Sequence, residues 1–394
     1  MKILLKENEE KLFQTETGAM EFFKKQEQEE IWKRCYTNEL SVFPIPGETC
    51  GLYDPDSIRT SCNMTSQISD ETIQEVIEST KLGLGVPLEK KENFPISNTA
   101  FVSLMQRAGY AASPVISNMK SKPNQGEMSP INKANVLNLG LSCYSNKALV
   151  LIRDEKIRAV LSGDESDYSR LPVTQLYQKI QKVLGEIYPN WSFKVATASH
   201  LFTTILVELN DGKLEEEIKN VFNKKAGFMS SGKPMLRMIT SDVGLSGANI
   251  LPVLRNSIGQ EMALGTPLCL THNNRHSVED FEKNLNQITA MFREAKDKLE
   301  EMLTRKIKHP AGCLKVIAKK CGLPKKLTCN EAEAFEAMYA NCYEIDVYQK
   351  LYELLDEYNN EVSISQSKYM DIQESIARIV FTNMSEYDYN FQWE

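Results

Sequence analysis

Short apolar runs separated by turn residues dominate the middle of the chain. The runs cover residues 235–239, 250–254 and 262–270, with glycine, asparagine and aspartate between them. Runs of this length and punctuation are typical of β-strands joined by tight turns. Polar residues stand at the ends of the runs, and we expect four of them to form one polar cluster. These four are Asp242, Arg255, Asn256 and His276.

The β pattern begins upstream of these runs. Residues 148–152 and 157–161 are apolar on either side of Asp154 and Glu155, which predicts a β-hairpin. Further along, a helix is predicted over 173–187 and strands over 192–198 and 202–209.

Helical periodicity marks both ends of the chain. Ser69 is the expected N-cap of a helix over 70–81, and a second helix is predicted over 99–108. Beyond His276, apolar residues recur from Phe281 to Met302 at alternating spacings of four and three. This seam predicts a helix that packs against a core, because oligomerising coiled coils usually continue for longer.

Together these patterns predict an α+β fold, with a central mainly antiparallel sheet, flanking helices and an α-helical C-terminal part. We expect three regions along the chain. They are a helical and loop region over 1–125, a central α+β domain over 126–276, and a helical region over 277–394 that ends in an acidic, aromatic tail.

Composition narrows the class of protein. With 394 residues, 42% hydrophobic and 25% charged, the chain resembles ordinary globular proteins and is long for a single core. The first residues turn acidic early, and no apolar run is long enough for a membrane span, so neither a signal peptide nor a membrane is predicted. The nine cysteines have no paired spacing and are interpreted as reduced thiols. Reduced thiols predict a cytoplasmic location. If a phage encodes the chain, this would be the cytoplasm of the host cell.

Charge is distributed unevenly along the chain. Eight basic and no acidic residues occur between Arg305 and Lys326, although the net charge of the whole chain is −7. From Asn330 onwards fourteen acidic residues face three basic ones. A basic segment followed by an acidic tail is common in proteins that handle nucleic acids, although solvated helix faces would give the same pattern.

Two stretches carry the candidate nucleic-acid contacts. In the hairpin, Arg153 and Arg158 flank the turn and Lys147 precedes the first strand. Their side chains are therefore predicted to contact successive phosphates of a nucleic-acid backbone. The second stretch, 314–326, is similar to the first helix and turn of a helix-turn-helix. Its lysines are Lys315, Lys319, Lys320, Lys325 and Lys326.

Metal and catalytic patterns are weak. No Cys-x-x-Cys or His-Glu-x-x-His spacing is present, so neither a metal nor a cofactor is predicted. Ser162 lies at a predicted strand end, and an enzyme acting on a nucleotide would use acidic and histidine side chains near such ends. The candidates for that alternative are Asp164, Asp167, Asp242 and His276.

Several motifs between Ser97 and Glu282 resemble the uncharacterised YfjQ/YafZ-type family of phage and plasmid proteins. The resemblance rests on Arg107-Ala108-Gly109-Tyr110, Leu151-Ile152-Arg153, Ile157 to Ser162, Thr240 to Gly244, Arg255-Asn256 and Arg275-His276. It implies a mobile-element protein and assigns no reaction.

We therefore predict a phage- or plasmid-encoded, non-catalytic protein that binds DNA, as a single strand, in replication or recombination. The hairpin and helix layout is similar to that of single-strand-annealing proteins. The alternatives are an enzyme acting on nucleic acid or nucleotide and a virion or host-takeover protein that binds other proteins. We also expect the acidic tail to cover the chain's own basic surface, dock a protein partner or pack as an edge strand. The sequence leaves undecided whether the chain associates into a homo-oligomer.

Overall fold

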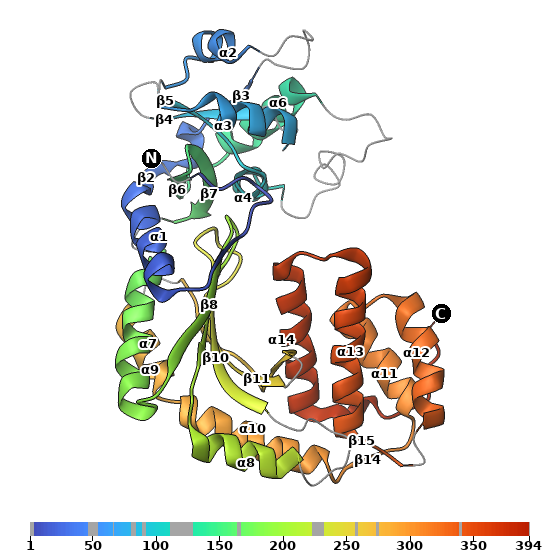
Figure 1. Cartoon of the computed structure of the whole chain (residues 1–394). Coiled ribbons are helices and arrows are strands. Elements are labelled where there is room, and N and C mark those ends of the chain that lie inside the picture. Colours follow the sequence, from blue (N-terminus) through green and yellow to red (C-terminus); the bar gives the residue numbers. More distant parts are fainter. Residues whose placement is uncertain are drawn as a thin grey trace.

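The two largest apolar cores divide the protein into an upper and a lower lobe (Figure 1). The computed structural model describes residues 4–45, 54–65, 67–79, 84–88, 92–110, 129–163, 167–222, 232–256, 259–272, 276–338 and 341–393. The fold is α+β, as the sequence predicts, with a mainly antiparallel sheet at the centre of the lower lobe and helices around it.

The lower lobe is built on a seven-stranded sheet. Its strands are β1 (Lys11–Phe13), β8 (Ser192–Ala198), β9 (Thr203–Glu208), β10 (Gly232–Thr240), β11 (Ala248–Asn256), β12 (Glu261–Ala263) and β13 (Leu268–Leu270). The order is β1-β8-β9-β10-β11-β12, with β13 also pairing with β11, and neighbouring strands are antiparallel. The apolar runs of the sequence therefore correspond to strands, as predicted.

Helices cover both faces of this sheet. One group comprises α1 (Glu16–Glu29), α7 (Val173–Ile187), α8 (Gly212–Phe222), α9 (Val278–Leu285) and α10 (Ile288–Met302). On the other face lies α14 (Gln366–Asn383), where the Arg237 guanidinium of β10 donates to Gln373 at 2.7 Å. Because both faces are covered, β10 is buried along almost its whole length, which explains its nearly continuous apolar sequence.

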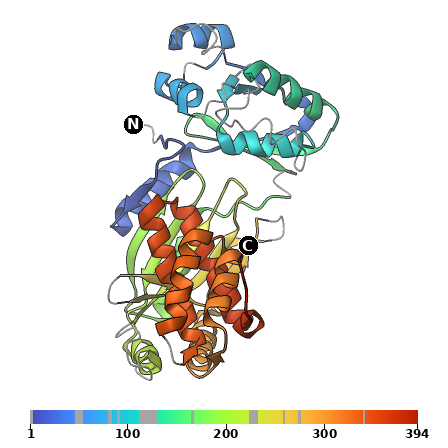
Figure 2. The same cartoon turned by 90° about the vertical axis from the view of Figure 1, so that its right-hand side faces the viewer.

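The C-terminal helices stand beside the sheet (Figures 1 and 2). They are α11 (Pro310–Cys321), α12 (Lys325–Met338), α13 (Glu344–Val362) and α14, followed by the short helix η5 (Met384–Tyr387). A two-stranded ribbon lies below them and consists of β14 (Lys306–Ile307) and β15 (Cys342–Tyr343). The Tyr348 hydroxyl of α13 donates to the Ala263 carbonyl of β12 at 2.7 Å. This bundle and the sheet share one core.

The helix predicted beyond His276 consists of two helices, α9 and α10, which meet at Asn286 and Gln287. Ser277 and Asp280 form the expected capping box, and the apolar seam is buried from Phe281 to Met302. The seam therefore packs into the core of the lower lobe.

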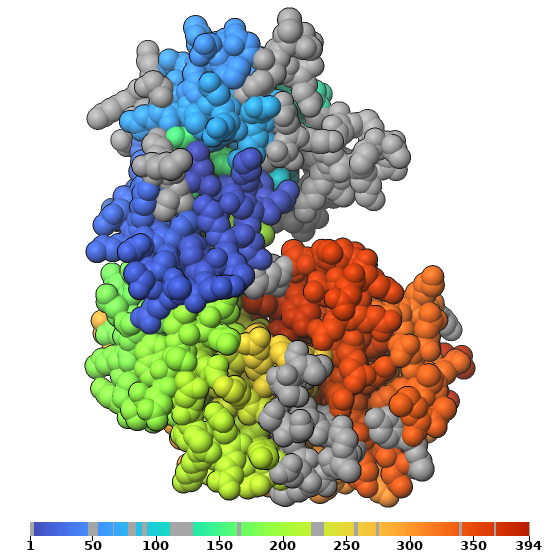
Figure 3. Space-filling view, viewed as in Figure 1, coloured from blue at the N-terminus to red at the C-terminus, as the bar shows by residue number. Residues whose placement is uncertain are grey.

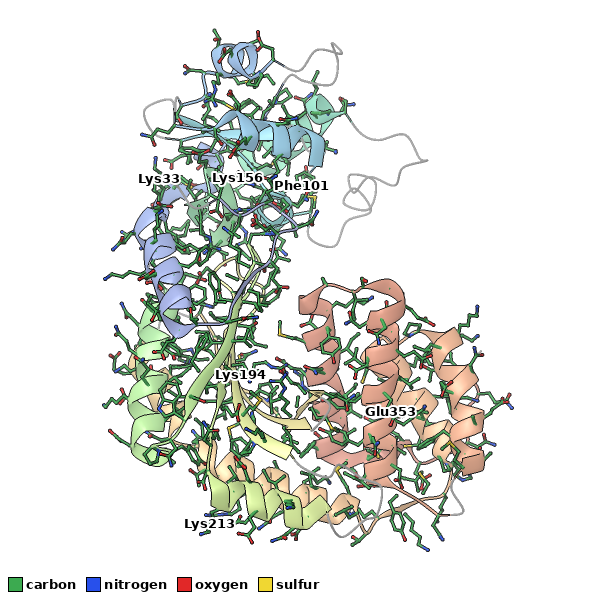
Figure 4. The ribbon with its side chains drawn as sticks, in the orientation of Figure 1. Lys33, Phe101, Lys156, Lys194, Lys213 and Glu353 are labelled. Carbon is green, nitrogen blue, oxygen red and sulfur yellow. The ribbon has the colours of Figure 1, made fainter. Side chains whose placement is uncertain are left out.

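The upper lobe contains two three-stranded sheets. Their strands are β2 (Ile31–Tyr36), β6 (Lys147–Arg153) and β7 (Lys156–Ser162) in one, and β3 (Phe43–Pro44), β4 (Leu84–Leu88) and β5 (Glu92–Pro95) in the other. The helices are the short η1 (Thr37–Glu39), α2 (Pro55–Cys62), α3 (Asp70–Gln74) with a π-turn over Glu75–Ser79, α4 (Asn98–Arg107) and α6 (Pro130–Ser142). Inside this lobe, where Figure 4 labels Lys156, the ammonium of this residue pairs with Glu75 at 2.7 Å.

The N-terminal segment joins the two lobes. Strand β1 pairs with β8 of the lower sheet, and β2 pairs with β6 of the upper one. Figure 3 shows these residues in blue, lying against both lobes on this face of the molecule.

The predicted boundary at residue 125 falls outside the described residues, but strands that precede and follow it pair with each other. Helices after residue 276 share their core with the central sheet, so the cores divide the chain differently from the three predicted regions.

Candidate functional site

The hairpin arginines are buried and do not form the predicted phosphate-binding face. Arg153 is 5% exposed, and its Nη1 lies 2.8 Å from Glu30 Oε1 and 3.2 Å from Asp242 Oδ2. Although burial opposes it, the charges of Glu30 and Asp242 raise the pKa of Arg153. This arginine holds the hairpin of the upper lobe against the turn that follows β10 in the lower lobe.

Arg158 is still more enclosed. No part of it reaches solvent, and its Nη2 lies 2.7 Å from Asp154 Oδ2 and donates to the Leu5 carbonyl at 2.7 Å. The prediction failed because both faces of the hairpin are covered by other elements, so alternation along a strand places no side chain in solvent here. Lys147, at the start of β6, is exposed.

The predicted polar cluster does not form. Arg255 lies opposite Lys233 and Glu261 at one end of the β10–β11 hairpin, while Asp242 follows β10 at the other end. At about 3.3 Å per residue, the length of β10 separates them by more than 20 Å. The His276 ring contacts Thr271 through Nδ1 at 3.0 Å. Asn256 closes β11 opposite Gly232, and its side chain lies outside the described residues.

The five predicted lysines of the C-terminal part gather around one helical corner. Helix α11 ends at Cys321, Gly322 follows in the left-handed region with φ of 78°, and α12 begins at Lys325. Lys319, Lys320, Lys325 and Lys326 are exposed and Lys315 is half-buried. Among the described residues, none of the five has a carboxylate within ion-pair distance. We call these five side chains the lysine patch.

The acidic tail packs against the lysine patch. The Lys320 ammonium lies 5.1 Å from the centre of the Tyr387 ring, and the Lys319 ammonium lies 5.4 Å from that of Phe391. Asp388 accepts hydrogen bonds from the backbone N–H groups of Lys308 and His309, just before α11. The tail is thus a structured part of the C-terminal bundle, with a short helix in place of the edge strand considered above.

A polar groove opens at the junction of the two lobes. Two hollows of about 420 and 450 Å³ share Gln106, Arg107, Ser162 and Asp167, so they form one continuous depression. The wall consists of the end of α4, the end of β7, the turn after β10 and the residues after β13. We call this depression the junction groove.

Two side chains in the junction groove have polar atoms without partners. The Nε of Arg107 is buried and makes no hydrogen bond, and burial lowers the pKa of this arginine. The Nδ1 of His272 lies 2.9 Å from the Ser169 carbonyl, so in a neutral ring Nδ1 carries the proton. Its Nε2 is then a hydrogen-bond acceptor, and it is buried without a partner.

An aromatic stack holds His272 in place. Its ring lies parallel to that of Tyr168 at 4.9 Å between centres, and Tyr168 in turn stacks on Trp32 at 5.7 Å. The Arg170 guanidinium lies over the Trp32 ring, 4.7 Å from its centre. The Tyr168 hydroxyl donates to the Asp242 carbonyl at 3.2 Å. The imidazole orientation is therefore fixed by stacking and by a backbone contact.

The sequence motifs contribute unequally to this groove. Arg107, Ser162, Asp167 and Tyr168 line it, whereas Asp242 is engaged with Arg153 beside it. Asp164 and Arg275 lie outside the described residues. His272 stood at the end of an apolar run, and no sequence signal linked it to Arg107.

A separate hollow of about 560 Å³, outside the junction groove, lies between α10 and residues 264–268. Its charged lining is mainly acidic, with Glu294, Asp297 and Glu301, and Glu301 pairs with Lys298 and Arg305. No side chain of its described lining has a buried polar atom without a partner. Each hollow of the junction groove is smaller than this one, but the side chains that line the groove carry buried polar atoms without partners.

No protein family, curated protein or solved structure matches this chain. Within the described ranges, three histidine, cysteine or carboxylate side chains nowhere meet in an arrangement suited to a metal ion. In the same ranges, every helix is too short or too polar to cross a membrane.

Proposed function

We propose that the protein binds single-stranded nucleic acid through phosphates at the lysine patch. One observation supports this most: five lysines surround a single helical corner, and none is neutralised by a carboxylate among the described residues. Elsewhere, basic groups such as Lys156 and Arg158 are held in internal ion pairs. Ammonium groups without counter-charges attract a polyanion and release its condensed counterions on binding.

The surroundings of the lysine patch favour a single strand over a duplex. Tyr387 and Phe391 lie over two of the lysines, and the Tyr389 ring is 45% exposed beside them. Lysines interleaved with aromatic rings are typical of single-strand sites, where bases stack and phosphates contact cations. Along α12, the exposed Glu333 and Glu336 would repel phosphates if this helix entered a major groove. A role in replication or recombination forms part of the proposal.

The test is the salt dependence of binding to a labelled single-stranded oligonucleotide, measured by fluorescence anisotropy on the full chain. Each phosphate contact on a single strand contributes about −0.7 to the slope of log affinity against log salt. The double variant Lys325→Gln/Lys326→Gln should therefore bind more weakly and lose about 1.4 from the slope. These two lysines avoid the tail, which contacts Lys319 and Lys320.

The matched control removes two exposed lysines from α8, Lys213→Gln/Lys219→Gln (Lys213 is labelled in Figure 4). It changes net charge by the same amount far from the lysine patch. Equal slopes and affinities for both double variants would show that binding is not localised at the patch, and an absence of binding at low salt would refute the proposal outright.

A further inference from the structure

The junction groove contains two polar groups that the fold leaves unsatisfied. Leaving a buried donor or acceptor without a partner costs about 1–3 kcal/mol, and proteins rarely retain such groups without a use. Here the Arg107 and His272 side chains that carry these two atoms both line one hollow of about 420 Å³. They come from opposite lobes, so the groove is completed only when the lobes meet.

Each group specifies the chemistry of its partner. Arg107 has no carboxylate within ion-pair distance in the described part of the chain, and a planar guanidinium prefers a phosphate or carboxylate. In a neutral ring the Nε2 of His272 accepts a hydrogen bond and therefore requires an O–H or N–H donor. Leu161, Val243 and Leu245 add apolar wall between polar positions.

The size of the groove indicates more than a simple inorganic ion. The two joined hollows, of about 420 and 450 Å³, are within the range of about 300–1,000 Å³ found for small organic ligands. The outer hollow continues towards Lys147 and Asn146. A ligand with an anionic group, hydroxyl or amino donors and an apolar body satisfies all of these features.

We propose that the junction groove binds a nucleotide, with its phosphate at Arg107 and a sugar hydroxyl or base N–H at His272 Nε2. The nucleotide is either a free mononucleotide or the phosphorylated end of a nucleic-acid strand, which present the same chemistry. This site is separate from the lysine patch, so each proposal can fail without the other.

One structural role of Arg107 must be separated from ligand binding. It lies in the last turn of α4, where any cation stabilises the helix dipole. Arg107→Lys keeps that charge but removes the fork of donors, whereas Arg107→Gln removes both. The control is Arg293→Gln, which removes an exposed helix arginine on α10, away from the groove.

The measurement is isothermal titration of deoxyadenosine monophosphate into the full chain and its variants, with circular dichroism to verify folding. We expect binding that Arg107→Gln weakens by roughly ten- to a hundredfold, the effect of losing a charged hydrogen bond. Arg107→Lys should fall between wild type and Arg107→Gln, and Arg293→Gln and Lys325→Gln/Lys326→Gln should bind like wild type. If Arg107→Gln fails to fold, the Arg107→Lys comparison alone decides the result.

A second arm compares a 5′-phosphorylated oligonucleotide with its unphosphorylated twin in competition with the mononucleotide. Arg107-dependent preference for the phosphorylated strand assigns the groove to strand ends, and equal competition by both strands assigns it to free nucleotides. Absence of mononucleotide and strand-end binding overturns the proposal and leaves water as the occupant of the groove. Binding that is unchanged in both Arg107 variants overturns it as well.

Discussion

The contact between the tail and α11 can be tested at Gly312. This glycine lies in the first turns of α11, and a Cβ there would come 2.1 Å from the Tyr389 carbonyl oxygen and 2.9 Å from the Phe391 nitrogen. Both atoms belong to the backbone of the tail, which cannot yield as a flexible side chain would. Gly312→Ala should therefore displace the tail.

Two opposing effects decide the sign of the change in stability. Alanine is about 1 kcal/mol more favourable than glycine inside a helix, which alone would stabilise the variant. Detaching the tail removes the hydrogen bonds of Asp388 to the start of α11, which resemble an N-cap and contribute about 1–2 kcal/mol. It also removes the cation–π contacts of Lys319 and Lys320, about 0.5–1 kcal/mol each. The net expectation is a loss of about 1–3 kcal/mol.

The assay combines thermal melting with hydrogen exchange of the backbone amides of residues 384–393. Gly185→Ala on α7 is the matched control, because no atom lies within 4 Å of the added Cβ. We expect Gly185→Ala to melt higher than wild type and Gly312→Ala to melt lower, with faster exchange confined to the tail. If Gly312→Ala also melts higher and its tail amides stay protected, the tail does not pack on α11 as described.

The same variant addresses regulation by the tail. If the tail restricts access to Lys319 and Lys320, freeing it should tighten binding to a single strand, most at low salt where screening is weak. A truncation after Thr382 should behave in the same way. Unchanged affinity combined with a lower melting temperature would assign the tail a purely structural role.

Two further predictions concern buried charges in the interior. Arg158→Met should destabilise the protein by about 3–5 kcal/mol in denaturant unfolding, because it leaves the Asp154 carboxylate buried without its partner; a loss below 1 kcal/mol would contradict the buried pairing. Glu27→Gln should have the opposite sign at neutral pH. Burial, together with the charge of Asp242, raises the pKa of Glu27 despite its hydrogen bonds with Thr174. The stability from this carboxyl is thus complete at low pH, where it is protonated, and is lost as pH rises past its unfolded value of 4.5 and through the raised folded value. The variant should match wild type below about pH 4 and exceed it at pH 7, and equal stability at both pH values would show that the carboxyl is not disfavoured by folding.

The sequence predicted individual elements well because their signals are local. The helix over 173–187 has a one-sided apolar face, and the structure places α7 over Val173–Ile187. Ser69 caps its helix as expected, since an N-cap depends only on the following turn. The hairpin around Asp154 and Glu155 also forms, with both residues in the left-handed region that a tight turn needs.

The functional residues were harder to predict because their surroundings are not local. The strand pattern put Arg153 and Arg158 on strand faces but did not reveal that other elements cover both faces of this hairpin. The ends of apolar runs suggested that Asp242 and Arg255 meet, whereas antiparallel pairing carries them to opposite ends of β10 and β11. Arg107 and His272 come together only through the junction of two lobes, which periodicity does not encode.

The pairing of the N-terminal segment has a consequence for how the chain is made. Strand β1 has its partner around Ala198 and β2 has its partner around Leu149, so neither can pair until long stretches of later chain have emerged. At about 5–20 residues per second, β1 waits on the order of 10–40 seconds during synthesis. Throughout that interval the strand edges and the Phe22 and Phe23 side chains of α1 are without their native cover. Residues 11–36 therefore stay without their strand partners while those partners are being synthesised, and binding by a chaperone in this interval would protect them from non-native contacts.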